Sequence, residues 1–145
     1  MLHSTSTCVN AVSADENYIA SQLPARLDSA LQAIRSHAPG AKIVLLGYPE
    51  LYDLSKSSTC IGLSTTDRTK LDEASDTIDS VISAAAGRAG DTFADVRGQF
   101  AGHEICDGSS SWLHSVNIFD ISESYHPTAN GQELGYEPVF AAKAG

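Results

Sequence analysis

Two short apolar runs on either side of a long amphipathic segment constrain the fold of this chain most. Residues 42–48 form a largely apolar run after a helical stretch, which is typical of a parallel strand buried on both faces. Residues 91–96 predict a second strand. Between them, a helix is expected to begin near Ser64 or Thr65, both good N-caps, and to close at Gly87 and Gly90. Strand, helix and strand in this order predict a right-handed βαβ unit with parallel strands.

The helix of this unit carries an apolar face and an acidic run. The apolar positions recur at helical spacing and are Leu71, Ala74, Ile78, Val81, Ile82 and Ala85. The acidic residues lie elsewhere around the helix and are Asp72, Glu73, Asp76 and Asp79. Because charge runs are usually hydrated, we expect these carboxylates to form a solvated face.

The N-terminal region predicts a further helix. Ser13 and Glu16 have the spacing of a capping box, and Pro24 interrupts the apolar pattern that follows. We therefore expect a helix from about Leu23 to His37, preceded by a short helical turn.

A long connection and a histidine follow the second predicted strand. Residues 97–122 form a connection whose length is typical of functional or disordered loops. His126 directly precedes Pro127, so it is expected in an extended or turn conformation before a last helix over about 128–143. Because ligands of open α/β sheets bind beyond the carboxyl ends of the strands, His126 is a candidate site residue. Glu123 lies three residues earlier and can orient an imidazole that acts as a base. The alternative is a loop histidine that only caps the helix.

Size and charge exclude several classes of protein. The 145 residues are expected to form one domain, 1–145, and 42% hydrophobic residues predict a globular chain. The net charge is −9 and the nine Lys and Arg residues are scattered, so no nucleic acid partner is expected. No apolar run approaches the roughly 20 residues of a transmembrane helix. The first seven residues lack the charged and apolar regions of a signal peptide, so none is expected in this chain.

The sequence offers cysteines and histidines as possible metal ligands. Cys8, Cys60 and Cys106 include no Cys-x-x-Cys pair, so they predict either one disulfide and one free thiol or three buried thiols. His103, Cys106, His114 and His126 lie in one loop region, but their spacing matches no standard metal site. We expect no metal and no cofactor. Trp112 and Tyr125 are candidates for an acyl pocket or for ordinary packing.

Three segments together resemble the SGNH (GDSL-type) ester hydrolases, in particular their secreted actinobacterial branch. Residues 43–49 resemble the fourth strand of that branch, and residues 93–106 resemble its fifth strand and the following loop. Residues 123–132 resemble its Asp-x-x-His-Pro block, with Glu123 at the acid position. The resemblance implies a flavodoxin-like three-layer α/β/α fold, incomplete here, with about two parallel strands and flanking helices. It also implies metal-free, serine-based hydrolysis of carboxylic esters or lipids by a secreted parent protein.

The resemblance assigns roles to particular residues. His126 would take the proton of the attacking serine, oriented by Glu123, by a main-chain carbonyl or, less favourably, by Asp120. Cys60 and Cys106 would form a disulfide, and the partner of Cys8 would lie upstream. The Gly-Asp-Ser, glycine and Gly-x-Asn-Asp blocks of the family do not occur in this sequence. Residues 107–109 read Asp-Gly-Ser, which has the wrong order and lies in the late loop.

We therefore interpret the chain as the C-terminal part of an esterase or lipase domain, through truncation or a misassigned start. On this interpretation the isolated chain is expected to be inactive and to self-associate through an exposed sheet edge. The alternative is a non-catalytic α/β module that binds a ligand or partner through the long loop.

Overall fold

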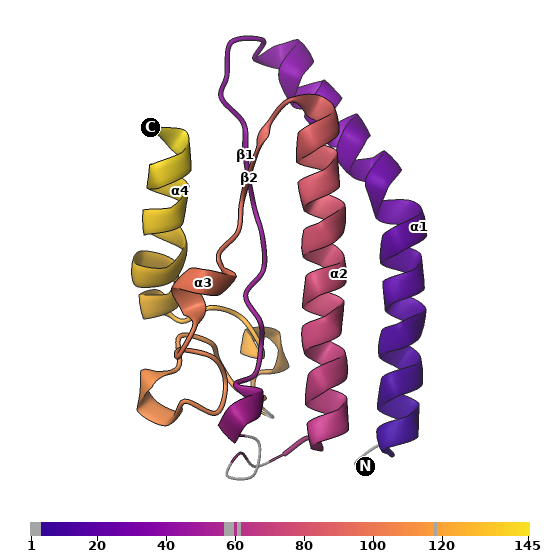
Figure 1. Ribbon diagram of the computed structural model, residues 1–145, viewed down its shortest axis with the longest axis vertical. Coiled ribbons are helices and arrows are strands. Elements are labelled where there is room, and N and C mark those ends of the chain that lie inside the picture. The colour runs from indigo at the N-terminus through magenta and orange to yellow at the C-terminus, as the bar shows by residue number, and fades with distance from the viewer. Residues whose placement is uncertain (1–3, 57–59, 61, 118) are drawn as a thin grey trace.

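The computed structural model describes residues 4–56, 60, 62–117 and 119–145. The main elements are α1 (Thr5–His37), β1 (Val44–Leu46), α2 (Thr65–Ala89), β2 (Thr92–Ala94), α3 (Arg97–Phe100) and α4 (Glu137–Ala144). Shorter helical segments are η1 (Leu54–Lys56), η2 (Gly108–Ser110), η3 (Ile121–Glu123) and η4 (Gly131–Tyr136). The strands lie between α4 on one side and α2 on the other, and α1 packs against the outer side of α2 (Figure 1).

The two strands form the parallel pair that the sequence predicts. Val44 aligns with Thr92 and Leu46 with Ala94, and α2 connects the strands. The N–H of Gly47 donates to the carbonyl of Ala94 at 2.9 Å, which extends the pairing beyond β1. Figure 1 shows that both strands end at the side of the molecule where the long loop folds.

The expectation that the first strand is buried on both faces is wrong. All three residues of β1 are only half-buried. Within the described residues the sheet has two strands, so one edge of β1 has no neighbouring strand to cover it. An edge of this kind is what favours self-association, which stays a prediction.

The N-terminal helix is longer than expected. It runs without a break from Thr5 through Pro24 to His37, so the predicted start near Leu23 and the capping box at Ser13 are wrong. Ser4 is the N-cap, and Glu16 pairs with Lys70 of α2 at 2.6 Å. Pro24 removes one hydrogen bond, and α1 changes direction partway along its length (Figure 1). The extensive packing of α1 on α2 stabilises the helix across this defect.

The ends of α2 agree with the sequence. Ser64 caps its start, in a capping box with Asp67. Gly90 closes it in the left-handed conformation that glycine adopts without strain, at φ +71°. Gly87, which was expected to help close the helix, is still helical.

The last helix contains a π-helical turn. Residues 129–144 are helical, close to the predicted range, but η4 has wider turns than an α-helix. Pro138 has no N–H to offer to the carbonyl of Leu134. That carbonyl accepts instead from the side-chain Nε2 of Gln99 at 2.9 Å, which ties the last helix to α3.

The long loop folds over a small core rather than extending into solvent. The buried residues of this core are Tyr52, Val96, Phe100, Ile105 and Leu113. The predicted disulfide between Cys60 and Cys106 is present beside this core, with a Cα–Cα distance of 5.2 Å. Of the loop over 50–63, residues 57–59 and 61 lie outside the described part.

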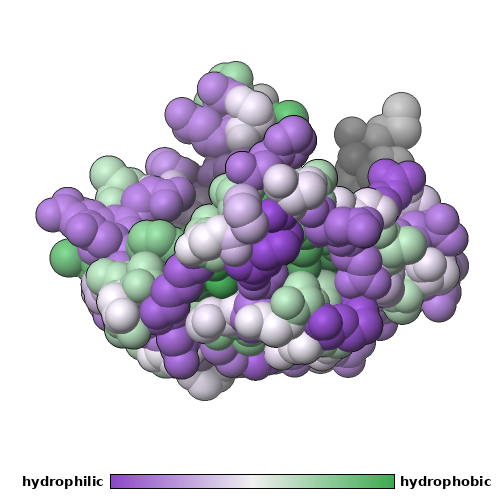
Figure 2. All heavy atoms as spheres, turned by 90° about the horizontal axis from the view of Figure 1, so that it is seen from above, coloured by the Kyte–Doolittle hydropathy of each residue, from purple (hydrophilic) through white to green (hydrophobic). Residues whose placement is uncertain are grey.

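The face of the molecule at the end of α1 is largely polar. Seen from the end at which α1 terminates, hydrophilic residues dominate and hydrophobic ones form small patches between them (Figure 2). In the described part of the chain, no helix has the length and apolar composition that crossing a membrane requires.

Candidate functional site

His126 lies on the loop at the carboxyl ends of the strands, as expected. Its side chain is exposed, whereas its backbone is held on both sides. The N–H of His126 donates to the carbonyl of Glu123 at 3.1 Å, and its carbonyl accepts from the N–H of His114 at 2.9 Å. The N–H of Tyr125 donates to the carbonyl of His114 at 2.9 Å. The turn that carries the imidazole is therefore pinned to the segment around His114.

The residues after His126 are fixed against the same segment. Pro127 forms an antiparallel bridge with Leu113, and the N–H of Thr128 donates to the carbonyl of Trp112 at 2.8 Å. A Cβ at Gly131 would lie 2.4 Å from that carbonyl, so only glycine permits this approach. The start of the last helix is thus locked beside the candidate site.

An apolar groove of about 320 Å³ opens beside His126. It lies between the residues that follow β1, one face of α2 and the loop that carries the histidine. Its apolar lining includes Pro49, Leu51, Leu71, Ala74, Ile78 and Tyr136. The arrangement places the His126 imidazole at the border of a surface suited to hydrocarbon.

Two carboxylates of α2 hold the chain that forms one wall of this groove. Asp79 accepts from the N–H of Tyr48 at 2.7 Å. Asp72 accepts from the N–H groups of Leu51 and Tyr52 at 2.8 and 3.1 Å. The expectation of a solvated face is wrong for these two residues, because Asp79 is 2% exposed and Asp72 is 6% exposed. Glu73 and Asp76 are exposed, as expected.

The sequence carried a signal for this burial. Asp72 and Asp79 are seven residues apart, two helical turns, and the buried Ser75 lies between them on the same stripe. Gly47 contributes from the strand side, because a Cβ there would lie 2.7 Å from the Asp79 carboxylate. The two carboxylates therefore accept hydrogen bonds from backbone N–H groups of the chain that follows β1.

Burial shifts the titration of both carboxyls. Desolvation raises the pKa of Asp72 to about 6, against the lowering effect of its two backbone donors. Desolvation likewise raises the pKa of Asp79 to about 6, opposed by the Tyr48 N–H and by Arg97, whose Nε lies 3.6 Å from the carboxylate.

These shifts predict a pH dependence of stability. Because the folded pKa of Asp79 lies above the ordinary value of 3.8, its contribution to stability is fully present below pH 3.8 and is lost as the pH rises through about 6. Between pH 4 and pH 7 the parent chain should lose about 2 kcal/mol of unfolding free energy through Asp79, and Asp79→Asn should abolish this part of the loss, measured by urea unfolding. The exposed Glu73→Gln should leave the pH dependence unchanged. An equal pH dependence in Asp79→Asn and the parent chain would contradict this assignment.

The acids proposed to orient the imidazole have other hydrogen-bond partners. In the described part of the chain, no hydrogen bond or ion pair joins the Glu123 carboxylate to the His126 ring; the carboxylate accepts from the Asn117 amide at 3.2 Å. Asp120 instead caps η3 and accepts from the N–H of Ser122 at 3.1 Å. The orienting role of Glu123 therefore stays a prediction.

The other candidates named from the sequence lie in different surroundings. Trp112 stacks on His103 with ring centroids 3.6 Å apart and meets Phe100 edge-on, so it is a packing residue. Tyr125, in contrast, lines the groove. Cys106 is in the disulfide and has no free thiolate to join the suggested metal ligands. Within the described residues, no group of three His, Cys, Asp or Glu side chains is placed to hold a metal ion.

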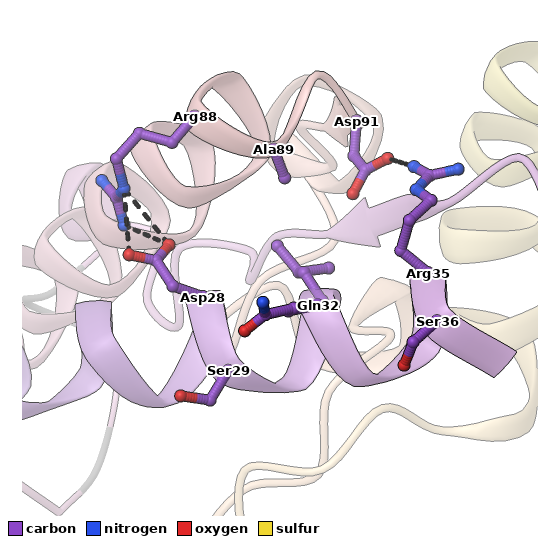
Figure 3. A pocket seen from close by; sticks show the side chains of 9 residues that line it. Asp28, Ser29, Gln32, Arg35, Ser36, Arg88, Ala89 and Asp91 are labelled. Carbon is purple, nitrogen blue, oxygen red and sulfur yellow. Dashed lines mark hydrogen bonds and ion pairs between the residues drawn. The ribbon is translucent and has the colours of Figure 1, made fainter. Parts of the chain in front are cut away.

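A larger cavity of about 630 Å³ lies at the opposite end of the strands (Figure 3). Arg88 pairs there with Asp28 at 2.8 Å, and Arg35 pairs with Asp91. The two arginines and two aspartates compensate one another. None of the candidate site residues named from the sequence lines this cavity.

The layered structure is the incomplete SGNH-type α/β/α fold that the sequence resemblance implies. An extracellular lipase from Streptomyces rimosus superposes with a TM-score of 0.91 at 43% identity, covering 98% of this chain and 59% of that one. Phospholipase A1 from Streptomyces albidoflavus NA297 superposes with a TM-score of 0.92 at 45% identity, covering 99% of this chain and 60% of that one. The expected fold class is confirmed.

Curated proteins extend the comparison to sequence. Lipase 1 of Streptomyces coelicolor is 49% identical over 144 residues, which are 99% of this chain and 53% of that protein. A lipase of Streptomyces rimosus is 45% identical over 139 residues, which are 96% of this chain and 51% of that protein. No protein-family model matches. The chain is similar over nearly its whole length to these Streptomyces lipases and spans about half the length of the curated relatives it matches.

Proposed function

We propose that this chain is the C-terminal, histidine-bearing part of a serine-type hydrolase of carboxylic esters, with the serine supplied by a segment outside it. One observation carries the proposal: an exposed imidazole beside an apolar groove at the carboxyl ends of the strands, in a close relative of lipases. In open α/β sheets, ligands bind beyond the carboxyl ends of the strands.

In the proposed reaction His126 acts as general base and then as general acid. The ring accepts the hydroxyl proton while the serine attacks the ester carbonyl, and it returns the proton to the departing alkoxide. Glu123 is the proposed orienting acid. Its main-chain carbonyl accepts from the N–H of His126, which keeps the two residues in one turn. The oxyanion donors belong to the family blocks that this sequence lacks.

The substrate class follows from the groove. Its apolar lining fits the hydrocarbon part of an ester with an acyl chain. The related proteins are named lipases and a phospholipase A1, which supports lipid esters as substrates. The disulfide between Cys60 and Cys106 favours an oxidising location, so the parent protein is proposed to be secreted.

The proposal is tested with the Lipase 1 chimera, in which residues 1–145 replace the matched segment of Lipase 1 of Streptomyces coelicolor. We expect the purified chimera to hydrolyse p-nitrophenyl butyrate, because it restores the groups that this chain lacks. The isolated chain should show no hydrolysis above background. Hydrolysis by the isolated chain would show that the nucleophile lies within it, against the proposal. A folded chimera without activity would favour the non-catalytic binding module.

A further inference from the structure

The residue before His126 has an unusual backbone conformation. Tyr125 lies at φ +66°, in the left-handed region that bulky side chains disfavour. A relaxed tyrosine would adopt a negative φ and turn the following residue to a different direction. Such a conformation persists only where surrounding contacts enforce it, and it is frequent at functional sites.

The side chain of Tyr125 contacts a second tyrosine, Tyr52. The hydroxyl of Tyr52 donates to the hydroxyl of Tyr125 at 3.1 Å. The two rings meet edge-on, with centroids 6.2 Å apart and planes at 69°. Tyr125 is thus held by its side chain as well as by its N–H bond to His114.

Tyr52 is itself rigidly placed. It is 4% exposed and belongs to the buried core. Its N–H donates to Asp72 of α2, it forms a parallel bridge with Ile105, and the Arg68 guanidinium lies 5.7 Å from its ring centroid. Burial raises the pKa of Tyr52 above its usual range, so the hydroxyl keeps its proton and remains a donor.

We propose that Tyr52 and Tyr125 are positioning residues that hold His126 toward the groove through their shared hydroxyl contact. The inference rests on the proposed function, since it supplies geometry to the base named there. Proton transfer requires the imidazole within about 2.6–3.2 Å of the hydroxyl that it serves. Releasing Tyr125 lets its backbone relax and carries the ring of His126 out of this range.

The test uses Tyr52→Phe in the Lipase 1 chimera, because it removes one hydroxyl from the core and leaves the groove lining intact. The kcat for p-nitrophenyl butyrate should fall roughly 10- to 100-fold with KM unchanged, the cost of a displacement of about 1 Å. Tyr125→Phe should cause the same loss. The double variant should be no slower than either single one, because the two share one contact. Tyr18→Phe, on the exposed side of α1, is the matched control and should change neither constant.

A second readout is histidine NMR of the Lipase 1 chimera. Tyr52→Phe should shift the imidazole NMR resonances of His126 and leave those of His37 in place. A kcat within twofold of the parent, additive losses in the double variant, or unshifted His126 resonances would each overturn the positioning role. Failure of the proposed function looks different, because His126→Ala would then keep full activity in the same chimera.

Discussion

The Lipase 1 chimera that carries His126→Ala is expected to hydrolyse p-nitrophenyl butyrate roughly 10³- to 10⁶-fold more slowly than the parent chimera. The loss is large because the serine hydroxyl is a weak nucleophile until a base accepts its proton. The alanine removes an exposed side chain whose backbone partners remain, so the fold should be unaffected. The measurement is kcat from initial rates, with circular dichroism to verify folding.

The matched control is His37→Ala, at the end of α1, which should leave kcat unchanged. Glu123→Gln should lower kcat by roughly 10- to 100-fold, because it weakens the orientation of the ring but keeps the base. Activity of His126→Ala within tenfold of the parent would show that another group accepts the proton.

Replacing Cys60 and Cys106 together by serine is expected to lower the free energy of unfolding by about 4 kcal/mol. The disulfide closes a loop with a sequence separation of 46, so its removal frees much chain entropy in the unfolded state. The bridge also ties Cys60 to the segment of the buried Ile105, against which Tyr52 pairs. The measurement is urea unfolding of the parent chain and of the double variant at the same protein concentration.

Cys8→Ser is the control for this prediction. The free Cys8 lies at the start of α1 beside Asp67, and burial is the main cause of its raised pKa. Its replacement should change the free energy of unfolding by less than about 1 kcal/mol, the usual range away from core contacts. A loss below 1 kcal/mol for the double replacement would mean that the bridge adds little to stability.

Local patterns in the sequence were enough to predict the framework of the fold. The capping residue Ser64 and the closing Gly90 bound α2 where expected, because caps act through nearest neighbours. The parallel pairing of β1 and β2 follows from the connection through α2. The location of His126 before a helix follows from Pro127 alone.

Features that depend on distant contacts were not predictable in the same way. Pro24 lies inside α1 because packing on α2 outweighs its local effect. Asp72 and Asp79 are buried because backbone N–H groups far along the chain need acceptors. The hydroxyl of Tyr125 meets that of Tyr52, which no local spacing relates to it.

The crystal structure of the Lipase 1 chimera tests the central claim most directly, through the distance between the His126 ring nitrogen and the serine Oγ of the Gly-Asp-Ser block. The account predicts a separation of about 2.6–3.2 Å, or slightly longer without substrate. A ring turned away from that hydroxyl and more than about 6 Å from it, with another base in its place, would contradict the account.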